Sequence, residues 1–436
     1  MKTIKCIAVV LTLIFLISCA QIPHLQQANM SYHQGKFNES EAVLKYFVES
    51  KKAMKDPSYP LVLLILADSQ FRLGDYQSAL RSYDAVIKSM TAELSEGKIA
   101  LGFLKSESNR PYRGTPHDLA FAHYYKGICY FQMDNYEKAR IEFAKARLSD
   151  KGEKTGQEDD IACVHFMEGL CYERLNDPNE ASVAFRKVTK LKPEFPFGWL
   201  KLSFMSDKLG YQDDADRYWN KYTSIVPSNQ LLPRNNEAKC IFLIVDLGKG
   251  PYKRADVVTG QFANYQKGIY QESGFDVSLS GTKYGTGYEL DDTYFQAKTE
   301  GGFAGEAARK VVSAVAKTAV KQIPIIGDLL AGKAQADLRV WYSLSGEIYM
   351  SILPAENDIE CVLNIDYYSD SKRKGKQYLK SYEQNWYFIP SQTQSLAKPI
   401  YLISMNNLHN LNVDHTSISE KVKAKNEKIK ENLKKR

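Results

Sequence analysis

Three side chains at alternate positions in the second half of the chain could form a ligand-binding row. Asp337, Arg339 and Trp341 are two residues apart, so on a β-strand they would share one face. A carboxylate, a guanidinium and an indole on one face could hold a polar ligand. The alternative is a structural Asp–Arg ion pair packed against the indole. We favour the ion pair because no nucleophile accompanies the row.

Other patterns of known chemistry are incomplete. Gly248–Pro251 has glycines but lacks the GxxxxGK[ST] spacing of a phosphate loop, and its proline removes a needed N–H, so we predict a tight turn. The seven histidines form no HExxH or Ser–His–Asp pattern, the cysteines form no CxxC pair, and Asp291–Asp292 lacks the alternating ligands of a calcium loop. We therefore expect no metal, no cofactor and no enzyme activity.

The N-terminus has the pattern of an export sequence. A basic start precedes the apolar run Cys6–Ile17, which is short for a transmembrane helix. Leu16–Cys19 resembles the lipobox of bacterial lipoproteins, in which the cysteine thiol is acylated and becomes the new N-terminus. The resemblance implies that Cys19 is the lipidation site. Ala20 stands where Asp would retain a lipoprotein in the inner membrane, so we expect the outer membrane.

The positive charge of the chain is concentrated in its C-terminal tail. The formal net charge is +7, and it falls to +5 when Lys2 and Lys5 leave with the export sequence. Residues 420–436 carry seven Lys and one Arg against three Glu, which is also +5, so residues 19–419 are formally neutral. A nucleic-acid-binding domain would carry its charge on a folded face, so we expect no nucleic acid. The tail could contact anionic lipid or glycan, or form a solvated helix.

The first half contains internal repeats. Each has Gly, Asn or Asp at a turn, then Ala, then an aromatic residue four positions later. The Ala and aromatic pairs of four copies are Ala79/Tyr83, Ala139/Phe143, Ala181/Phe185 and Ala215/Trp219. This resembles the tetratricopeptide repeat (TPR), a helix pair in which the small residue allows close approach. The resemblance covers about residues 21–227 and implies an all-α solenoid.

TPR arrays have a concave groove lined by the first helix of each pair. Aromatic and oppositely charged side chains in this groove would suit a protein or peptide partner better than a small metabolite. The alternative is that the same chain fills the groove, through an insertion or its C-terminal half. In register, the predicted groove residues are Phe71, Arg72, Phe121, Tyr124, Phe131, Gln132, Glu173, Arg174, Asp207 and Lys208.

The second half has the patterns of strands. Cys240–Val245 is an apolar, β-branched run typical of a buried strand, and Ile348, Met350 and Ile352 alternate as on a strand face. An amphipathic helix is predicted at 306–322. We expect a strand-rich domain, either a β-sandwich or α+β.

A more specific resemblance covers nearly the whole mature chain. TPR-containing bacterial lipoproteins of uncharacterised function have a strand ending in Gly-x-Gly-Pro, an Ala-rich basic helix and an Ala-Asp-x-Arg-x-Trp strand. Here these are Gly248–Pro251, the helix from Glu306, and Ala336–Trp341. Ser345 follows Leu344 where the family would have Pro. The resemblance implies an envelope location and no established reaction.

These patterns predict a multidomain lipoprotein of the bacterial envelope, anchored in the outer membrane and facing the periplasm. The expected function is a protein–protein interaction scaffold in outer-membrane biogenesis, secretion or polysaccharide export. The alternative is an envelope hydrolase or glycan-binding enzyme whose site lies in the C-terminal domain, with the repeats as adaptor. The expected parts are a lipoprotein signal peptide at 1–18, a TPR-like domain at 19–233, a strand-rich domain at 234–416, and a basic helical or disordered tail at 417–436.

Overall fold

The structure is a computed structural model of the chain. It describes residues 23–50, 53–92, 111–150, 161–232, 234, 240–255, 263–279, 281–301, 337–354, 359–371, 375–388 and 400–404. Cys19, the helix predicted at 306–322 and the basic tail lie outside the described residues. Within the described ranges, no helix is long and apolar enough to cross a membrane.

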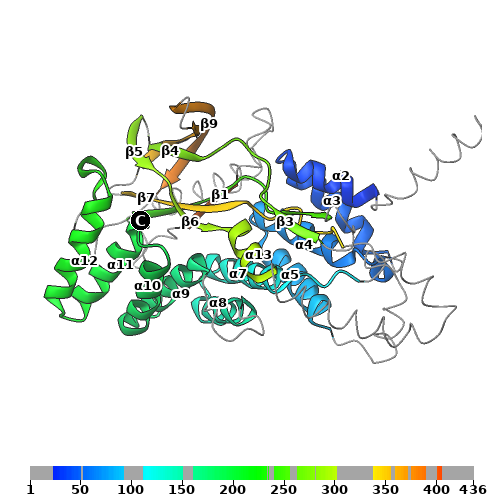
Figure 1. The fold of residues 1–436 in the computed structure, drawn as a ribbon, viewed down its shortest axis with the longest axis horizontal. Helices are drawn as coiled ribbons and strands as arrows, with labels where there is room; N and C mark the ends of the chain where they lie inside the picture. Colours follow the sequence, from blue (N-terminus) through cyan, green and yellow to red (C-terminus); the bar gives the residue numbers. More distant parts are fainter. Residues whose placement is uncertain are drawn as a thin grey trace, which may run out of the picture.

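The first half folds into consecutive antiparallel helix pairs that stack side by side (Figure 1). The first helices of the pairs are α2 (Pro23–His33), α4 (Tyr59–Arg72), α7 (Pro116–Gln132), α9 (Ala162–Arg174) and α11 (Pro196–Lys208). The second helices are α3 (Phe37–Val48), α5 (Tyr76–Thr91), α8 (Tyr136–Asp150), α10 (Pro178–Leu191) and α12 (Gln212–Ile225). Short 3-10 turns lie at η1 (Ala53–Lys55) and η3 (Ser228–Gln230).

The repeated residue pattern has a direct structural cause. Gly127 on α7 faces the ring of Phe143 on α8, and a Cβ at this glycine would lie 2.6 Å from the ring. Gly169 and Phe185 repeat the same contact one pair later, also at 2.6 Å. In these two pairs, the glycines therefore let the helices approach around a buried aromatic ring. The turns between these helices use left-handed residues, Asp134 (φ 61°) and Asn176 (φ 60°), which tolerate that conformation.

The second half forms two four-stranded sheets and a small ribbon. Sheet A has the order β10-β1-β7-β6, with β1 and β10 parallel and the other pairs antiparallel. The outer sheet is antiparallel, with the order β5-β4-β8-β9, and β2 pairs with β3 in the ribbon. The bounds are β1 (Cys240–Leu247), β2 (Tyr252–Ala255), β3 (Ala263–Gln266), β4 (Gly274–Leu279), β5 (Thr282–Thr286), β6 (Tyr288–Asp292), α13 (Thr293–Gly301), β7 (Glu347–Pro354), β8 (Ile359–Ser371), β9 (Gly375–Phe388) and β10 (Ile400–Ser404).

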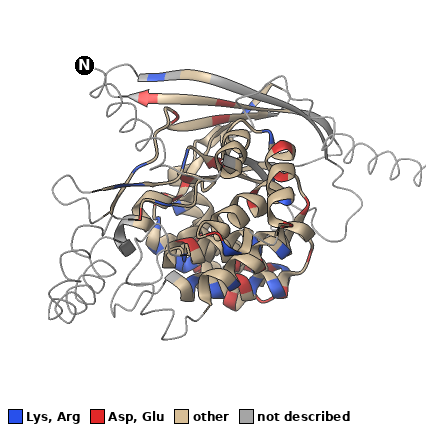
Figure 2. Ribbon diagram, turned by 90° about the vertical axis from the view of Figure 1, so that its right-hand side faces the viewer, with Lys and Arg blue, Asp and Glu red and all other residues tan. Residues whose placement is uncertain are grey.

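Sheet A is the middle of three layers, between the helices and the outer sheet. Side chains alternate along β1, so Phe242 and Ile244 belong to the core shared with the helices. Leu243 and Val245 belong to a second core, which includes Phe275 of β4 and side chains of β8. Figure 2, which looks along the array, shows the strands above the helices, with acidic and basic residues interspersed over the outer helices.

Candidate functional site

The concave face of the helical array is covered by sheet A and by the segment that precedes β7. At its centre, Arg72 of α4 forms an ion pair with Asp246 of β1, and the two side chains are 4% and 2% exposed. Tyr125 of α7 donates a hydrogen bond from its hydroxyl to Asp246 at 3.2 Å and shares a hydrogen bond of 3.1 Å with Ser345. Arg72 also donates to the hydroxyl of Tyr32 on α2, at 3.3 Å. The central charge of the groove is therefore neutralised by a residue of the same chain.

A second buried carboxylate, Asp68, lies one helical turn before Arg72 on α4. Its oxygens accept hydrogen bonds from the Tyr83 hydroxyl at 2.6 Å, from the Trp341 indole at 2.7 Å, and from the Ser343 hydroxyl. Burial raises the pKa of Asp68 to about 6, although these three hydrogen bonds oppose the shift. Asp68 therefore joins the helices of one repeat to the segment before β7.

Aromatic contacts extend the interface along the array. Phe166 on α9 lies 6.1 Å from Phe242 between ring centroids, and Phe197 on α11 meets Tyr288 of β6 edge-on at 5.5 Å. The ammonium of Lys201 lies 4.8 Å from the ring centroid of Phe242. First helices of three successive pairs, from α7 to α11, thus contact the strand domain, which makes the covering continuous.

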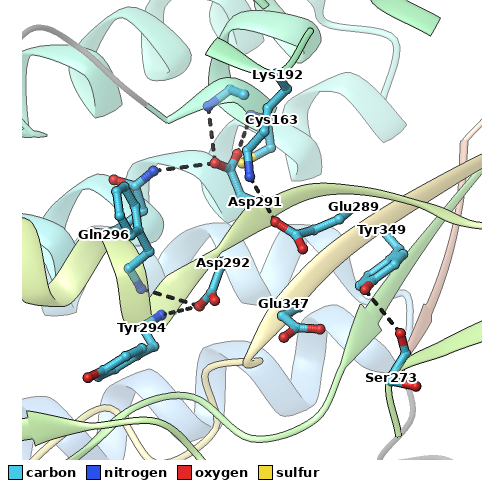
Figure 3. Close-up of polar contacts among 12 residues, drawn as sticks. Cys163, Lys192, Ser273, Glu289, Asp291, Asp292, Tyr294, Gln296, Glu347 and Tyr349 are labelled. Carbon is cyan, nitrogen blue, oxygen red and sulfur yellow. Dashed lines mark hydrogen bonds and ion pairs between the residues drawn. The ribbon is translucent and has the colours of Figure 1, made fainter. Parts of the chain in front are cut away.

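Sheet A also caps one of the helices. The carboxylate of Asp291 on β6 accepts hydrogen bonds from the backbone N–H groups of Ala162, at 3.3 Å, and of Cys163 (Figure 3). The N-cap residue of α9 itself, Ile161, makes no side-chain cap. Burial raises the pKa of Asp291 to about 6, with Lys192 and the two N–H groups opposing it. Because free N–H groups at a helix start need acceptors, this aspartate satisfies α9 from 129 residues away.

A more exposed ion pair lies beside this cap. The ammonium of Lys192, just after α10, lies 2.8 Å from Glu289 of β6, and both side chains are partly exposed (Figure 3). On the other side of β6, Lys267 bridges Glu347 at 2.6 Å and Asp292 at 3.7 Å. In the described part of the chain, no three His, Cys, Asp or Glu side chains are placed to hold a metal ion.

The structure corrects the prediction of an open partner-binding groove. Phe71, Phe121, Tyr124 and Phe131 are at most 3% exposed, and Gln132 is buried too. Their rings pack against other aromatic residues, as Phe71 does against Tyr125 at 5.4 Å. The physical reason is that three of these rings belong to the core of the helix pairs: Phe121 packs against Tyr124, Tyr124 against Phe143 of α8, and Phe131 against Tyr136 of α8. The covering by sheet A is seen instead at Arg72 and Tyr125, which both contact Asp246. The alternative, in which the same chain fills the groove, is the arrangement that the structure shows.

The charged members of the predicted groove lie towards its margins. Glu173 accepts from the Lys201 ammonium at 2.7 Å, and Arg174 is half-buried. Asp207 lies 3.7 Å from Arg234, and Lys208 is exposed. These residues therefore do not converge on one site.

The predicted ligand row is divided between two roles. Asp337 and Arg339 form a bidentate ion pair at 2.8 and 2.7 Å, and Arg339 also donates to the carbonyl of Pro57 at 3.0 Å. Trp341 points instead to Asp68 in the buried interface. Residues 337–341 are not a strand, so the prediction that all three share a strand face is wrong. The Asp337–Arg339 ion pair matches the structural alternative. The hydrogen bond from Arg339 to Pro57 attaches this segment to the helical array.

The chain bends at Gly248, directly after β1, and the backbone hydrogen bonds of the described segment Gly248–Pro251 include none within it. Gly248 has a left-handed backbone (φ 69°), and the N–H of Gly250 donates to the Leu344 carbonyl at 2.7 Å. A Cβ at Gly250 would lie 2.8 Å from that carbonyl oxygen. The N–H that a phosphate would need is thus used to fasten this bend to the segment before β7.

Sequence reasoning missed the residues that close the interface, namely Asp68, Asp246, Asp291, Ser343 and Ser345. Two of them had a recognisable pattern. Asp68 follows the apolar run Leu61–Ala67, and Asp246 interrupts the apolar strand β1. A charge inside an apolar run needs a buried partner, so both positions predict a long-range polar contact. Nothing in the sequence says which residue provides it.

Comparisons with known proteins identify the repeats. Tetratricopeptide repeat family models match residues 61–89 and 164–195. A search of curated proteins finds no match. Solved structures that resemble the chain include a MamA protein, at 18% identity over 46% of this chain and 89% of that one, with a TM-score of 0.34. Another is MamA from residue 41 to its end, from Desulfovibrio magneticus RS-1, at 19% identity over 46% and 92%, with a TM-score of 0.34.

The two family matches cover α4–α5 and α9–α10, which are two of the helix pairs built on the repeated pattern. TPR units of this kind indicate a protein–protein interaction scaffold. The chain is a TPR-containing protein with a strand-containing C-terminal region.

Proposed function

We propose that this protein is a lipid-anchored envelope scaffold in which the TPR array and sheet A act as one rigid platform. Its place would be the outer membrane facing the periplasm, in an assembly for outer-membrane biogenesis, secretion or polysaccharide export. The lipobox-like Leu16–Cys19 supports the anchor, and the TPR matches support the scaffold. Anchoring raises the effective concentration of the platform for partners in the same membrane.

The observation that carries the proposal is the buried Arg72–Asp246 pair. Because it neutralises the centre of the concave face, a partner must bind elsewhere unless sheet A is removed. Figure 1 shows α8 on the side of α7 that is away from sheet A. There Ile141 and Leu148 are 44% and 65% exposed, seven residues apart on one face of α8. We propose this outer face of α8 as the partner surface.

The anchor is tested by metabolic labelling with a clickable palmitate analogue. The wild-type protein should be labelled, and the Cys19→Ala variant should not. Cys6→Ala is the matched control, because it removes the other cysteine of the export sequence and should leave labelling intact. Equal labelling of the Cys19→Ala variant would refute the anchor.

The partner surface is tested by photocrosslinking in intact envelopes. A benzoylphenylalanine at Ile141 or Leu148 should give one discrete crosslinked product. The same group at Tyr378 on β9, which is 55% exposed, is the control and should not give that product. If only the Tyr378 position crosslinks, the strand domain is the binding part and the outer face of α8 is not.

A further inference from the structure

The end of the array nearest the export sequence has exposed apolar side chains beside the start of the described chain. The ring of His24, in the first turn of α2, lies 5.8 Å from the ring of Phe47 near the end of α3. The start of α2 and the end of α3 are therefore at the same end of this helix pair. Tyr46 adjoins Phe47 and is 78% exposed, and Met54 in η1 is 69% exposed.

Helix geometry places Tyr46 on the outer side of α3. The buried residues of this helix are Phe37, Ser40 and Leu44, which follow the i, i+3, i+7 spacing of one face. At 100° per residue, position 46 is on the opposite side from that buried face. The ring therefore points away from the array, and no repeat precedes α2 in the described chain to cover this end.

The short stretch of chain between Cys19 and α2 limits how far this surface can lie from the acylated cysteine. Only four residue steps separate Cys19 from Pro23, the first residue of α2. Even when fully extended, they span about 14 Å. An acylated cysteine lies at the boundary between acyl chains and headgroups, so α2 must start within that distance of the boundary. Packed helices lie about 10 Å apart, so the end of α3 that is beside the start of α2 also lies near the membrane boundary.

We propose that the lipid bilayer is the partner of this end of the array, with Tyr46 and Met54 inserted among the headgroups. The inference rests on the proposed lipid anchor. Tyrosine suits this layer because its ring is apolar and its hydroxyl stays hydrated. Figure 1 shows α2 and α3 at one end of the array and α12 at the other, so the array would extend away from the membrane.

The charges at this end make the contact apolar rather than electrostatic. Lys45 forms an ion pair with Glu41 at 2.6 Å. In sequence, residues 41–56 carry four Lys against Glu41, Glu49 and Asp56, which is a net charge of +1. Since the charges nearly balance, insertion should depend little on anionic lipid or on salt.

The test uses the acylated full-length protein in vesicles whose phosphatidylcholine has brominated acyl chains, which quench tryptophan. The variants Tyr46→Trp and Met54→Trp are compared with Tyr211→Trp at the start of α12, where the native tyrosine is 60% exposed. Subtracting the wild-type protein removes the emission of its four native tryptophans. We expect a blue shift and a loss of the added emission at positions 46 and 54, and neither at position 211. Adding phosphatidylglycerol or salt should leave the result unchanged.

The possible failures are distinguishable. If the wild-type protein does not float with the vesicles, the lipid anchor and the proposed function fail. If it floats but the tryptophans at 46 and 54 are not quenched, the anchor holds and the docking proposal is overturned. In that case a second copy or a partner protein would be the occupant of this surface. Quenching at position 211 as well would overturn the proposed orientation.

Discussion

At the scale of residues, the Arg72–Asp246 pair is the contact on which the covered groove most depends. Both side chains are almost completely buried, so removal of one leaves the other charged in an apolar interior. We expect Arg72→Met to lower the free energy of unfolding by about 3–5 kcal/mol. The double variant Arg72→Met/Asp246→Leu should recover most of this loss. Urea denaturation followed by circular dichroism measures both.

The Lys192–Glu289 ion pair crosses the same interface at an exposed position and serves as the matched control. Lys192 and Glu289 are 29% and 42% exposed, so solvent screens their attraction. Glu289→Gln should therefore cost no more than about 1 kcal/mol, and it leaves Lys192 in place beside Asp291. If the cost of Arg72→Met were equally small, or if the double variant recovered nothing, the buried pair would not be what holds sheet A in place.

A second prediction at this scale concerns how stability depends on pH. It involves a carboxylate inside the helical array. Glu142 on α8 is buried among His123, Lys126 and Lys145, at 2.7, 3.0 and 2.9 Å. Burial alone would raise the pKa of Glu142, but hydrogen bonds from His123 and the two lysines outweigh it and lower the pKa to about 2. Because the folded-state pKa is below the usual 4.5, the stabilisation is complete above pH 4.5 and is lost as the pH falls towards 2.

The measurement is the free energy of unfolding at pH 7 and at pH 3. The wild-type protein should lose about 2 kcal/mol more over this interval than the Glu142→Gln variant, which has no carboxylate to titrate. Comparing the two losses, and not the two stabilities, cancels the contribution of the other carboxylates. Parallel pH profiles would show that the pKa of Glu142 is not lowered by folding.

At the scale of elements, Asp291 links β6 to the start of α9. We expect Asp291→Ala to cost about 0.5–2 kcal/mol and to speed amide hydrogen exchange at Cys163 and in β6 together. Asp177→Ala is the control, since Asp177 caps its own helix by accepting from the Glu180 N–H at 3.1 Å. That change should speed exchange only at the start of α10. If Asp291→Ala left β6 unaffected, the cap would not couple the two domains.

The elements that sequence predicted well are those whose cause is local. The helix pairs follow from contacts such as Gly127 with Phe143, which are 16 residues apart and recur one pair later as Gly169 with Phe185. The strand at Cys240–Val245 follows from its apolar run and is part of β1. Arg72 and Asp246 are 174 residues apart, and no local pattern encodes their pairing. The open groove was predicted from the helical repeats alone. The sheet that covers it is held by contacts between residues far apart in sequence, which the repeats do not encode.

One local prediction failed for a local reason. The alternation of Asp337, Arg339 and Trp341 suits a strand, but the Asp337 side chain accepts a hydrogen bond from the Arg339 backbone N–H at 3.0 Å. This side-chain bond takes the N–H that a strand ladder would use, so residues 337–341 form no strand. The short strands β2 to β6 were missed because runs of four to six residues give weak alternation.

At the scale of the whole molecule, the array and the strand domain share one core. A single cluster of buried residues includes Tyr125 and Phe166 of the helices together with Phe242 and Ile348 of sheet A. Proteins with separate domains often unfold in several steps, but a shared core makes two parts depend on each other. We therefore expect α9 and β1 to have the same opening free energy by native-state hydrogen exchange. A β1 that opens well before α9 would contradict this.

The same argument predicts the behaviour of the array alone. A fragment of residues 19–233 would leave Asp68 and Arg72 without Trp341 and Asp246, and would expose Phe166 to water. An uncovered apolar face is a docking or aggregation surface, so the fragment should bind the dye ANS and self-associate, whereas the full chain should not. A monomeric fragment that binds no dye and unfolds as cooperatively as the full chain would mean that the array is complete without sheet A, and that its concave face could be open to a partner.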